Sequence, residues 1–295
     1  MEVAVARYAG FCPGVRRAVR MVEETLERSS TPVYSLGPVI HNPQVVAELE
    51  ERGLRILPEE EGAWEETNLD GARVVVRSHG VPPDQQEKLL SLGATLVDAT
   101  CPTVKKAQRA AMRLVGEGYK LFVIGNAEHP EVKAILGNVR GEAVVIKEIQ
   151  ELKDWWVAWP RKVRKVGLIA QTTVDLMMFR SLVDGLINEV PELIREVMEL
   201  KIINTLCRNT LSRQAEAMQL ALGNDLVVVV GGRNSSNTEF LRRICEMAGT
   251  KAVKVETADE LDPSVTEGAR SAAVLGGAST PLRIVEEVRD WLASA

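Results

Sequence analysis

The feature that most constrains this chain is a threefold internal repeat built around three cysteines. Three short apolar segments, 2–12, 94–101 and 198–207, each run into a cysteine and continue as an amphipathic pattern of helical spacing. The first two copies read CPGVRRA and CPTVKKA, with Pro at the first helical turn, where a missing N–H costs nothing. The third copy, CRNTLSRQAEAMQLA, keeps only the helical spacing. The recurrence of such a segment three times along the chain indicates three related units.

Two further elements recur at nearly fixed distances from these cysteines, and each is an apolar run that ends in a polar loop. The first, in VYSLGPVIHN, LFVIGNAEHPE and LVVVVGGRNSSN, places three residues 28 or 29 positions after the cysteine: His41, His129 and Ser236. The second, in RVVVRSHGVPP, VGLIAQTT and SAAVLGGASTP, places three more at 67 to 72 positions: His79, Thr172 and Ser279.

The apolar runs indicate the fold class. Continuous Val, Ile and Leu stretches bounded by Gly and polar loops are typical of parallel strands buried on both faces. We predict an α/β fold of three pseudo-repeated units, each a small parallel sheet covered by helices, at 1–98 with Cys12, 99–199 with Cys101, and 200–295 with Cys207 and a C-terminal helix. Ligands of such sheets bind beyond the carboxyl ends of the strands, so the nine repeat positions should surround one centre.

Composition excludes several classes of protein. The chain has 295 residues, of which 45% are hydrophobic, so it can bury a substantial core without disulfides. The 36 Lys and Arg residues against 41 Asp and Glu give a net charge of −5, which argues against a nucleic-acid partner. The sequence has neither an apolar run of about 18 residues nor a secretory leader, so we expect a cytoplasmic protein without a membrane partner. In that compartment, cysteines serve as metal ligands, catalytic thiols or core residues.

The three repeat cysteines suggest a shared metal centre. They lie 89 and 106 residues apart, so no local clip exists and each thiol comes from a different repeat. Three thiolates suit a zinc site or an iron–sulfur cluster, and a cubane cluster held by three cysteines leaves one iron open. The alternative is that they are small buried residues at strand ends. Cys245 has no counterpart in the other repeats and is predicted to belong to the core.

The polar loops suggest an anion site. The chain has only three histidines, His41, His79 and His129, and all lie in these loops. Hydroxyl and amide side chains accompany them, together with glycine-flanked backbone amides in GGRNSSN and LGGASTP, in particular Asn42, Thr172, Thr173, the Asn234 to Asn237 segment with Ser235 and Ser236, and Ser279. Such groups cradle anions where helices begin, although the same residue types also cap helices and form turns.

Glu131 is a carboxylate at a strand-end loop, two residues after His129. This position favours a role as proton donor. The alternative is an acid in the first turn of a helix, where it complements the helix dipole.

The motifs AGFCPGV, VIHN, SHGV, DATCP, GNAEHPEV, QTT, NTLC, NSSN and GGASTP closely resemble the 4-hydroxy-3-methylbut-2-enyl diphosphate reductase family over nearly the whole chain. The resemblance implies three α/β units around a 4Fe-4S cluster with one open iron. The implied cluster ligands are Cys12, Cys101 and Cys207. The implied substrate-binding residues are His41, His79, His129, Thr172, Ser235, Ser236, Asn237 and Ser279, with Glu131 as the catalytic acid. The sequence departs from the family pattern at Ala170, Arg208 and Asn209.

The same resemblance implies the last step of the non-mevalonate isoprenoid pathway. In that reaction the C4 hydroxyl is removed reductively from the substrate to give isopentenyl and dimethylallyl diphosphate. The sequence has no GxGxxG turn for a bound nicotinamide or flavin, so electrons would come from a ferredoxin or flavodoxin. Two alternatives are an open-iron lyase similar to quinolinate synthase, which the diphosphate-type loops disfavour, and an iron–sulfur redox or iron sensor, which would not need the polar lining or the carboxylate.

Overall fold

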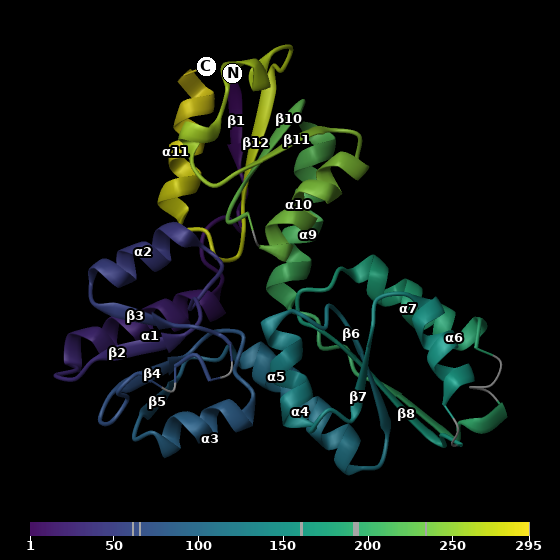
Figure 1. Cartoon of the computed structure of the whole chain (residues 1–295). Helices are drawn as coiled ribbons and strands as arrows, with labels where there is room; N and C mark the ends of the chain where they lie inside the picture. Colours follow the sequence, from purple (N-terminus) through teal and green to yellow (C-terminus); the bar gives the residue numbers. More distant parts are fainter. Residues whose placement is uncertain (61, 65, 160–161, 191–194, 234, 295) are drawn as a thin grey trace. The chain divides into compact units, whose positions relative to one another are not determined.

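The computed structural model describes residues 1–294 apart from 61, 65, 160–161, 191–194 and 234. Within these residues the strands form three four-stranded sheets with helices packed on them (Figure 1). The strand orders are β1-β12-β10-β11, β3-β2-β4-β5 and β7-β6-β8-β9. The predicted fold class, an α/β protein of three small parallel sheets, is confirmed.

The strands are short, as expected for small sheets. Their bounds are β1 Glu2–Val5, β2 Val33–Leu36, β3 Leu54–Leu57, β4 Arg73–Val76, β5 Thr95–Asp98, β6 Lys120–Ile124, β7 Ala143–Ile146, β8 Lys165–Ala170, β9 Glu199–Ile202, β10 Leu226–Val230, β11 Lys251–Val255 and β12 Ser271–Gly276.

Many of the helices begin with proline in the first turn, as the sequence predicts for α1 and α4. The helix bounds are α1 Pro13–Arg28, α2 Pro43–Glu51, α3 Pro83–Ser91, α4 Pro102–Gly116, α5 Pro130–Asn138, α6 Ile149–Ala158, α7 Leu176–Asn188, α9 Arg208–Gly223, α10 Ser236–Met247 and α11 Leu282–Ser294. None of the helices among the described residues has the length and apolar character needed to cross a membrane.

The sheet pairing differs from the expected unit boundaries in two places. Strand β1 was expected in the first unit, but it pairs in parallel with β12, from Glu2 beside Ser271 to Val5 beside Val274. The boundary after residue 199 falls inside β9, which pairs with β8. The reason is that each strand leading to a cysteine completes the sheet of the preceding repeat: β5 and β9 do so along the chain, and β1 does so for the last repeat.

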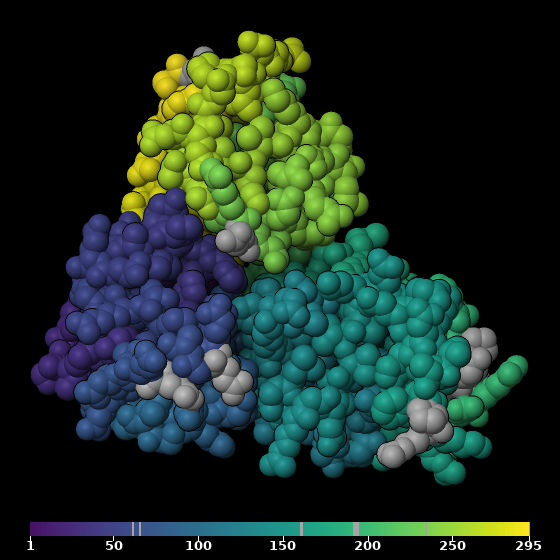
Figure 2. All heavy atoms as spheres, viewed as in Figure 1, coloured from purple at the N-terminus to yellow at the C-terminus, as the bar shows by residue number. Residues whose placement is uncertain are grey.

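The chain forms two compact units, and the first comprises Met1–Leu57 with Arg208–Ala295. Its sheet β1-β12-β10-β11 is covered by α11 on one face and by α9 and α10 on the other. Strand β10, LVVVV, is buried on both faces, because Val228 packs toward α11 while Val227 and Val229 pack toward α9 and α10. Cys245 lies in this second core layer, as predicted, and burial raises its pKa to about 11. In Figure 2 helix α11, in yellow, is at the surface of this unit.

The second unit is Pro58–Cys207. Its sheet β7-β6-β8-β9 carries a core in which Ala107, Ala111 and Leu114 of α4 meet Leu121 and Val123 of β6. Helix α5 adds Val132 and Ile135 to the same core. The parallel pair β4 and β5, with α3 beside it, belongs to this unit as well.

Candidate active site

All nine repeat positions follow the carboxyl end of a strand, as the sequence predicts. Cys12, Cys101 and Cys207 follow β1, β5 and β9; His41, His129 and Ser236 follow β2, β6 and β10; and His79, Thr172 and Ser279 follow β4, β8 and β12. The strands that contribute none, β3, β7 and β11, each lie at one edge of their sheet, and the strands that lead to the cysteines, β5, β9 and β1, lie at the opposite edges. The site is therefore a property of equivalent loops in each repeat.

Helix N-termini supply much of the local electrostatics. Cys12 is the N-cap of α1, and its sulfur accepts a hydrogen bond from the Val15 N–H at 3.4 Å. Cys101 is the N-cap of α4, and α9 begins directly after Cys207. The free N–H groups at a helix start carry partial positive charge, which favours thiolates and other anions.

In the first unit three loops lie against one another. The Ser279 hydroxyl donates to the carbonyl oxygen of His41 at 3.0 Å, and the Cys12 N–H donates to the Ala278 carbonyl at 3.0 Å. A Cβ at Gly232 would lie 2.6 Å from the His41 carbonyl oxygen, so only glycine allows this approach. The structure thus brings Cys12, His41, Ser279 and the loop after β10 together.

Buried amide groups that suit a ligand lie at the starts of α10 and α2. Among the described residues, both side-chain amide atoms of Asn237 are buried without a hydrogen-bond partner, as is Nδ2 of Asn42. Ser235 is buried as the N-cap of α10, whereas Ser236 is exposed, and the predicted Asn234 lies outside the described residues. Buried polar groups are normally satisfied, so the Asn237 amide is a candidate contact for a polar ligand.

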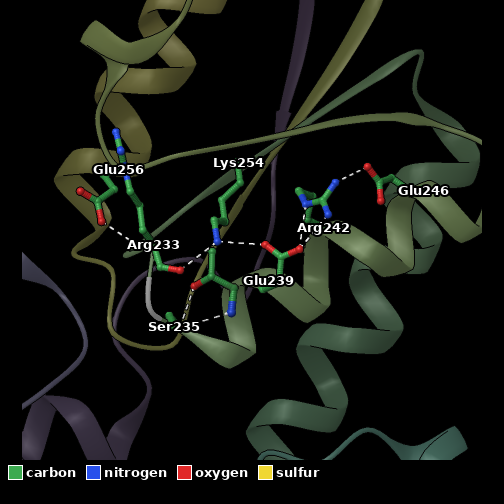
Figure 3. A network of polar contacts seen from close by, with 8 residues as sticks. Arg233, Ser235, Glu239, Arg242, Glu246, Lys254 and Glu256 are labelled. Atoms are coloured by element: carbon green, nitrogen blue, oxygen red, sulfur yellow. Dashed lines mark hydrogen bonds and ion pairs between the residues drawn. The ribbon is translucent and has the colours of Figure 1, made fainter.

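A network of ion pairs supports this loop from the side of β11 (Figure 3). Lys254 donates to the Arg233 carbonyl at 3.1 Å and to Glu239 at 2.9 Å, while the Arg233 N–H donates to Glu256 at 2.6 Å. Arg242 also pairs with Glu239, and together Arg242 and Lys254 lower the pKa of Glu239 to about 2. The backbone is therefore held at Arg233.

In the second unit, Cys101 lies beside the loop that carries His79. The Cys101 N–H donates to the Ser78 carbonyl at 2.9 Å. The rings of His79 and His129 meet edge to face with centroids 5.6 Å apart. These two histidines, 50 residues apart in sequence, therefore lie next to each other.

The same unit joins Glu131, Thr172 and Cys207. The carboxylate of Glu131 accepts two hydrogen bonds from Thr172, from the N–H and from the hydroxyl, both at 2.7 Å. The Thr172 carbonyl in turn accepts the Cys207 N–H at 2.9 Å. His129 Nδ1 accepts the Glu131 N–H at 3.2 Å, which fixes the side of the ring that faces α5. Hydrogen bonds thus connect the acid Glu131, the hydroxyl residue Thr172 and the backbone of Cys207 within the second unit.

Burial changes the acidity of Glu131. Its side chain is 1% exposed, and the loss of hydration raises its pKa from 4.5 to about 7, although the two hydrogen bonds from Thr172 oppose the shift. Glu131 lies in the first turn of α5, as one of the two interpretations of the sequence expects, and its role as proton donor stays a prediction. A carboxyl group with such a pKa can hold and release a proton near neutral pH.

Sequence reasoning missed three residues that shape these loops. Arg213 of α9 is buried and bonds to two loop carbonyls, Lys254 holds the loop after β10, and Thr205 bonds both the N–H and the carbonyl of Ala170. A helical-spacing analysis would have found the first, because Thr210, Arg213, Gln214, Ala217 and Ala221 share the buried face of α9. Ala170, a departure from the family pattern, is itself fully buried.

The three repeat cysteines have the character of ligands. Each is outside any disulfide, has intermediate exposure and lies at the start of a helix, unlike the fully buried Cys245. Within the described part of the chain, no three His, Cys, Asp or Glu side chains form a ready metal site. The donor set itself, three thiols from equivalent loops, fits a zinc or iron–sulfur centre.

The fold and these loops define an α/β protein with strand-end thiols, imidazoles and a protonatable acid. The family described as LytB protein matches residues 3–293. The chain belongs to this family.

Relatives named 4-hydroxy-3-methylbut-2-enyl diphosphate reductase include one from Geobacter metallireducens, 41% identical over 98% of this chain and 95% of the relative. Another, from Aquifex aeolicus, is 37% identical over 98% of this chain and 95% of its own length.

Two solved structures are similar to this one. The first is an (E)-4-hydroxy-3-methyl-but-2-enyl diphosphate reductase, described as the terminal enzyme of the non-mevalonate pathway, at TM-score 0.70 and 37% identity with both chains fully covered. The second is the E-1-hydroxy-2-methyl-but-2-enyl-4-diphosphate reductase from Plasmodium falciparum, at TM-score 0.88 and 25% identity, covering 98% of this chain and 87% of that one.

Replacing Glu131 by Gln should remove a pH dependence of stability. The pKa of Glu131 is about 7 in the folded chain against 4.5 as its ordinary value. The folded state therefore keeps a proton that the unfolded state releases, and the free energy of unfolding should fall by up to roughly 3 kcal/mol as pH rises across this window. Urea unfolding of both proteins at several pH values would show wild type losing stability relative to Glu131→Gln. Parallel curves at every pH would contradict the raised pKa.

Replacing Lys254 by Met should loosen the loop that precedes Ser235. The substitution keeps the aliphatic stem but removes hydrogen bonds to Arg233 and Glu239, each contributing about 1 kcal/mol. Binding of inorganic pyrophosphate, measured by calorimetry, should weaken about fivefold or more. Lys251→Met is the matched control, since Lys251 lies on the same strand and bonds only to the Val265 carbonyl among the described contacts. Equal affinity in both variants would show that Lys254 does not shape the loop.

Proposed function

We propose that this chain is a 4-hydroxy-3-methylbut-2-enyl diphosphate reductase. It would remove the C4 hydroxyl of its substrate to give isopentenyl and dimethylallyl diphosphate, the last step of the non-mevalonate pathway. The observation that carries the proposal is the arrangement of Glu131, Thr172 and Cys207. Thr172 is hydrogen-bonded both to the protonatable Glu131 and to the backbone of Cys207, a candidate metal ligand. Family membership and full-length similarity to reductases support it.

We propose Cys12, Cys101 and Cys207 as the ligands of a 4Fe-4S cluster. Their placement at equivalent strand ends and helix starts supports this assignment, and the buried Cys245 is excluded. When bound, such a cluster supplies electrons and an open iron that acts as a Lewis acid. The chain's own part is to present three cysteine sulfurs at helix N-termini.

We propose that the diphosphate is held by the loops rich in histidine and hydroxyl groups. His41, Ser235, Ser236, Asn237 and Ser279 line the first unit, where the buried Asn237 amide and the start of α10 suit an anion. His79, which meets His129 in the second unit, completes the set. Binding a remote diphosphate positions the reacting end of the substrate and contributes to rate by orientation.

We propose that Glu131 provides the proton that lets the hydroxyl leave as water. Its side chain is almost fully buried, so the Thr172 hydroxyl at 2.7 Å is the group through which its proton can reach a ligand. A hydroxyl both accepts and donates, so Thr172 can pass a proton on without changing charge. His129 lies beside this pair and would help to line the reacting end of the pocket.

The electron donor and the compartment stay predictions. The proposal requires an external donor such as a ferredoxin or flavodoxin and a cytoplasmic location, both expected from the sequence. An open-iron lyase or an iron sensor would not account for a chain that resembles reductases over 98% of its length.

The test is product formation by anaerobically reconstituted protein. With the diphosphate substrate and a strong reductant, the wild type should yield isopentenyl and dimethylallyl diphosphates, detected by mass spectrometry. Glu131→Gln should lower turnover by ~10²- to 10⁴-fold at unchanged KM, because it removes a proton transferred only in the transition state. No hydrocarbon diphosphate from wild type would refute the function, and normal turnover by the variant would refute the role of Glu131.

Serine substitution separates cluster ligands from the core cysteine. Cys12→Ser, Cys101→Ser and Cys207→Ser should each lose most of the iron and visible absorbance, because a hydroxyl is a poor ligand for a soft iron–sulfur centre. Cys245→Ser is the control and should keep both, since Cys245 packs against Ala217 in the core. Anaerobic iron and sulfide analysis is the measurement. A full cluster in the Cys101 variant, or its loss in the Cys245 variant, would overturn the assignment.

A further inference from the structure

Arg213 lies on the buried face of α9 and is 5% exposed. Its guanidinium donates from Nη1 to the Gly276 carbonyl at 2.8 Å and from Nη2 to the Gly10 carbonyl at 2.7 Å. These carbonyls belong to two different segments, Gly10 in the loop after β1 and Gly276 at the last residue of β12, where the next loop begins. A single planar fork therefore joins two backbone segments that are far apart in sequence.

The two loops carry residues of the candidate site. Gly10 precedes Cys12 by two residues, and Gly276 precedes Ser279 by three. The loops also meet directly, because the Cys12 N–H donates to the Ala278 carbonyl, and a Cβ at Gly276 would lie 3.2 Å from the Gly10 nitrogen. Gly10 has φ +85°, a conformation that favours glycine. Close approach leaves room for the guanidinium hydrogen bonds and little for a larger side chain.

Helix α9 holds the same segment from a second point. Glu216, one turn after Arg213, accepts the Arg7 N–H at 2.6 Å and the Tyr8 N–H at 3.0 Å. The helix thus offers a cation to loop carbonyls and a carboxylate to loop amides over residues 7–10. This pairing of charge with backbone polarity fixes the direction of the loop as well as its position.

We propose that Arg213 is a positioning residue that sets the thiol of Cys12 and the hydroxyl of Ser279 relative to each other. It acts through the carbonyls of Gly10 and Gly276. Lysine cannot replace it fully, because one ammonium lacks the two-armed geometry that reaches both carbonyls. The importance of this positioning for binding rests on the proposed function, whereas the loop bracing itself does not.

The test is amide hydrogen exchange of the full-length, anaerobically reconstituted protein, with Arg213→Met, Arg213→Lys and the control Arg20→Met. Arg20 lies in the same unit on α1 and is exposed. Loss of two hydrogen bonds from a charged donor should speed exchange at least about tenfold in peptides covering 6–12 and 276–280, with no change at 226–230 in β10. Arg213→Lys should be intermediate, and Arg20→Met should match wild type.

Unchanged exchange in the two loops would overturn the proposal. An equal increase in every peptide would overturn it too, since Arg213 would then only support the core; if Arg213→Met does not fold, Arg213→Lys gives the same comparison. Affinity for inorganic pyrophosphate, measured on the same samples, should fall about tenfold in Arg213→Met. Faster loop exchange with unchanged pyrophosphate affinity would support the bracing and count against the proposed diphosphate site.

Discussion

The candidate site depends on one geometrical constraint, that parallel strands of a sheet end at the same edge and the helices that follow them begin there. A short apolar strand such as β10 is stable only when both faces are covered, so polar groups are excluded from its length and gather at its end. The helices then bring N-terminal partial charges to the same edge. Cys12, Cys101, His129 and Ser235 are all N-caps for this reason.

Each repeat contributes one strand to the sheet of the repeat before it. Each strand that leads to a cysteine, β1, β5 or β9, completes the sheet of the preceding repeat. A cysteine therefore lies at the junction between the sheet its strand completes and the helix that opens its own repeat. In the first unit this junction is fixed by Arg213 and by the bond between Cys12 and Ala278, and in the second by the bond between Cys207 and Thr172.

The fold class and the strand-end positions could be predicted from the sequence because they follow from local patterns. Apolar runs such as LVVVV, prolines after cysteines and equal spacings can all be recognised in the sequence without knowledge of contacts. The pairing of β1 with β12 could not be predicted, because the two strands lie near opposite ends of the chain and no local sequence signal selects Ser271 as the partner of Glu2. The raised pKa of Glu131 likewise depends on burial by distant elements.

The most direct test of the account is an anaerobic crystal structure of the reconstituted protein with inorganic pyrophosphate. The account predicts one cluster bonded to the Sγ atoms of Cys12, Cys101 and Cys207. It also predicts pyrophosphate held by His41, Ser279 and the start of α10, with Glu131 on the side of Thr172. A cluster held by other residues, or pyrophosphate bound away from these loops, would contradict the account.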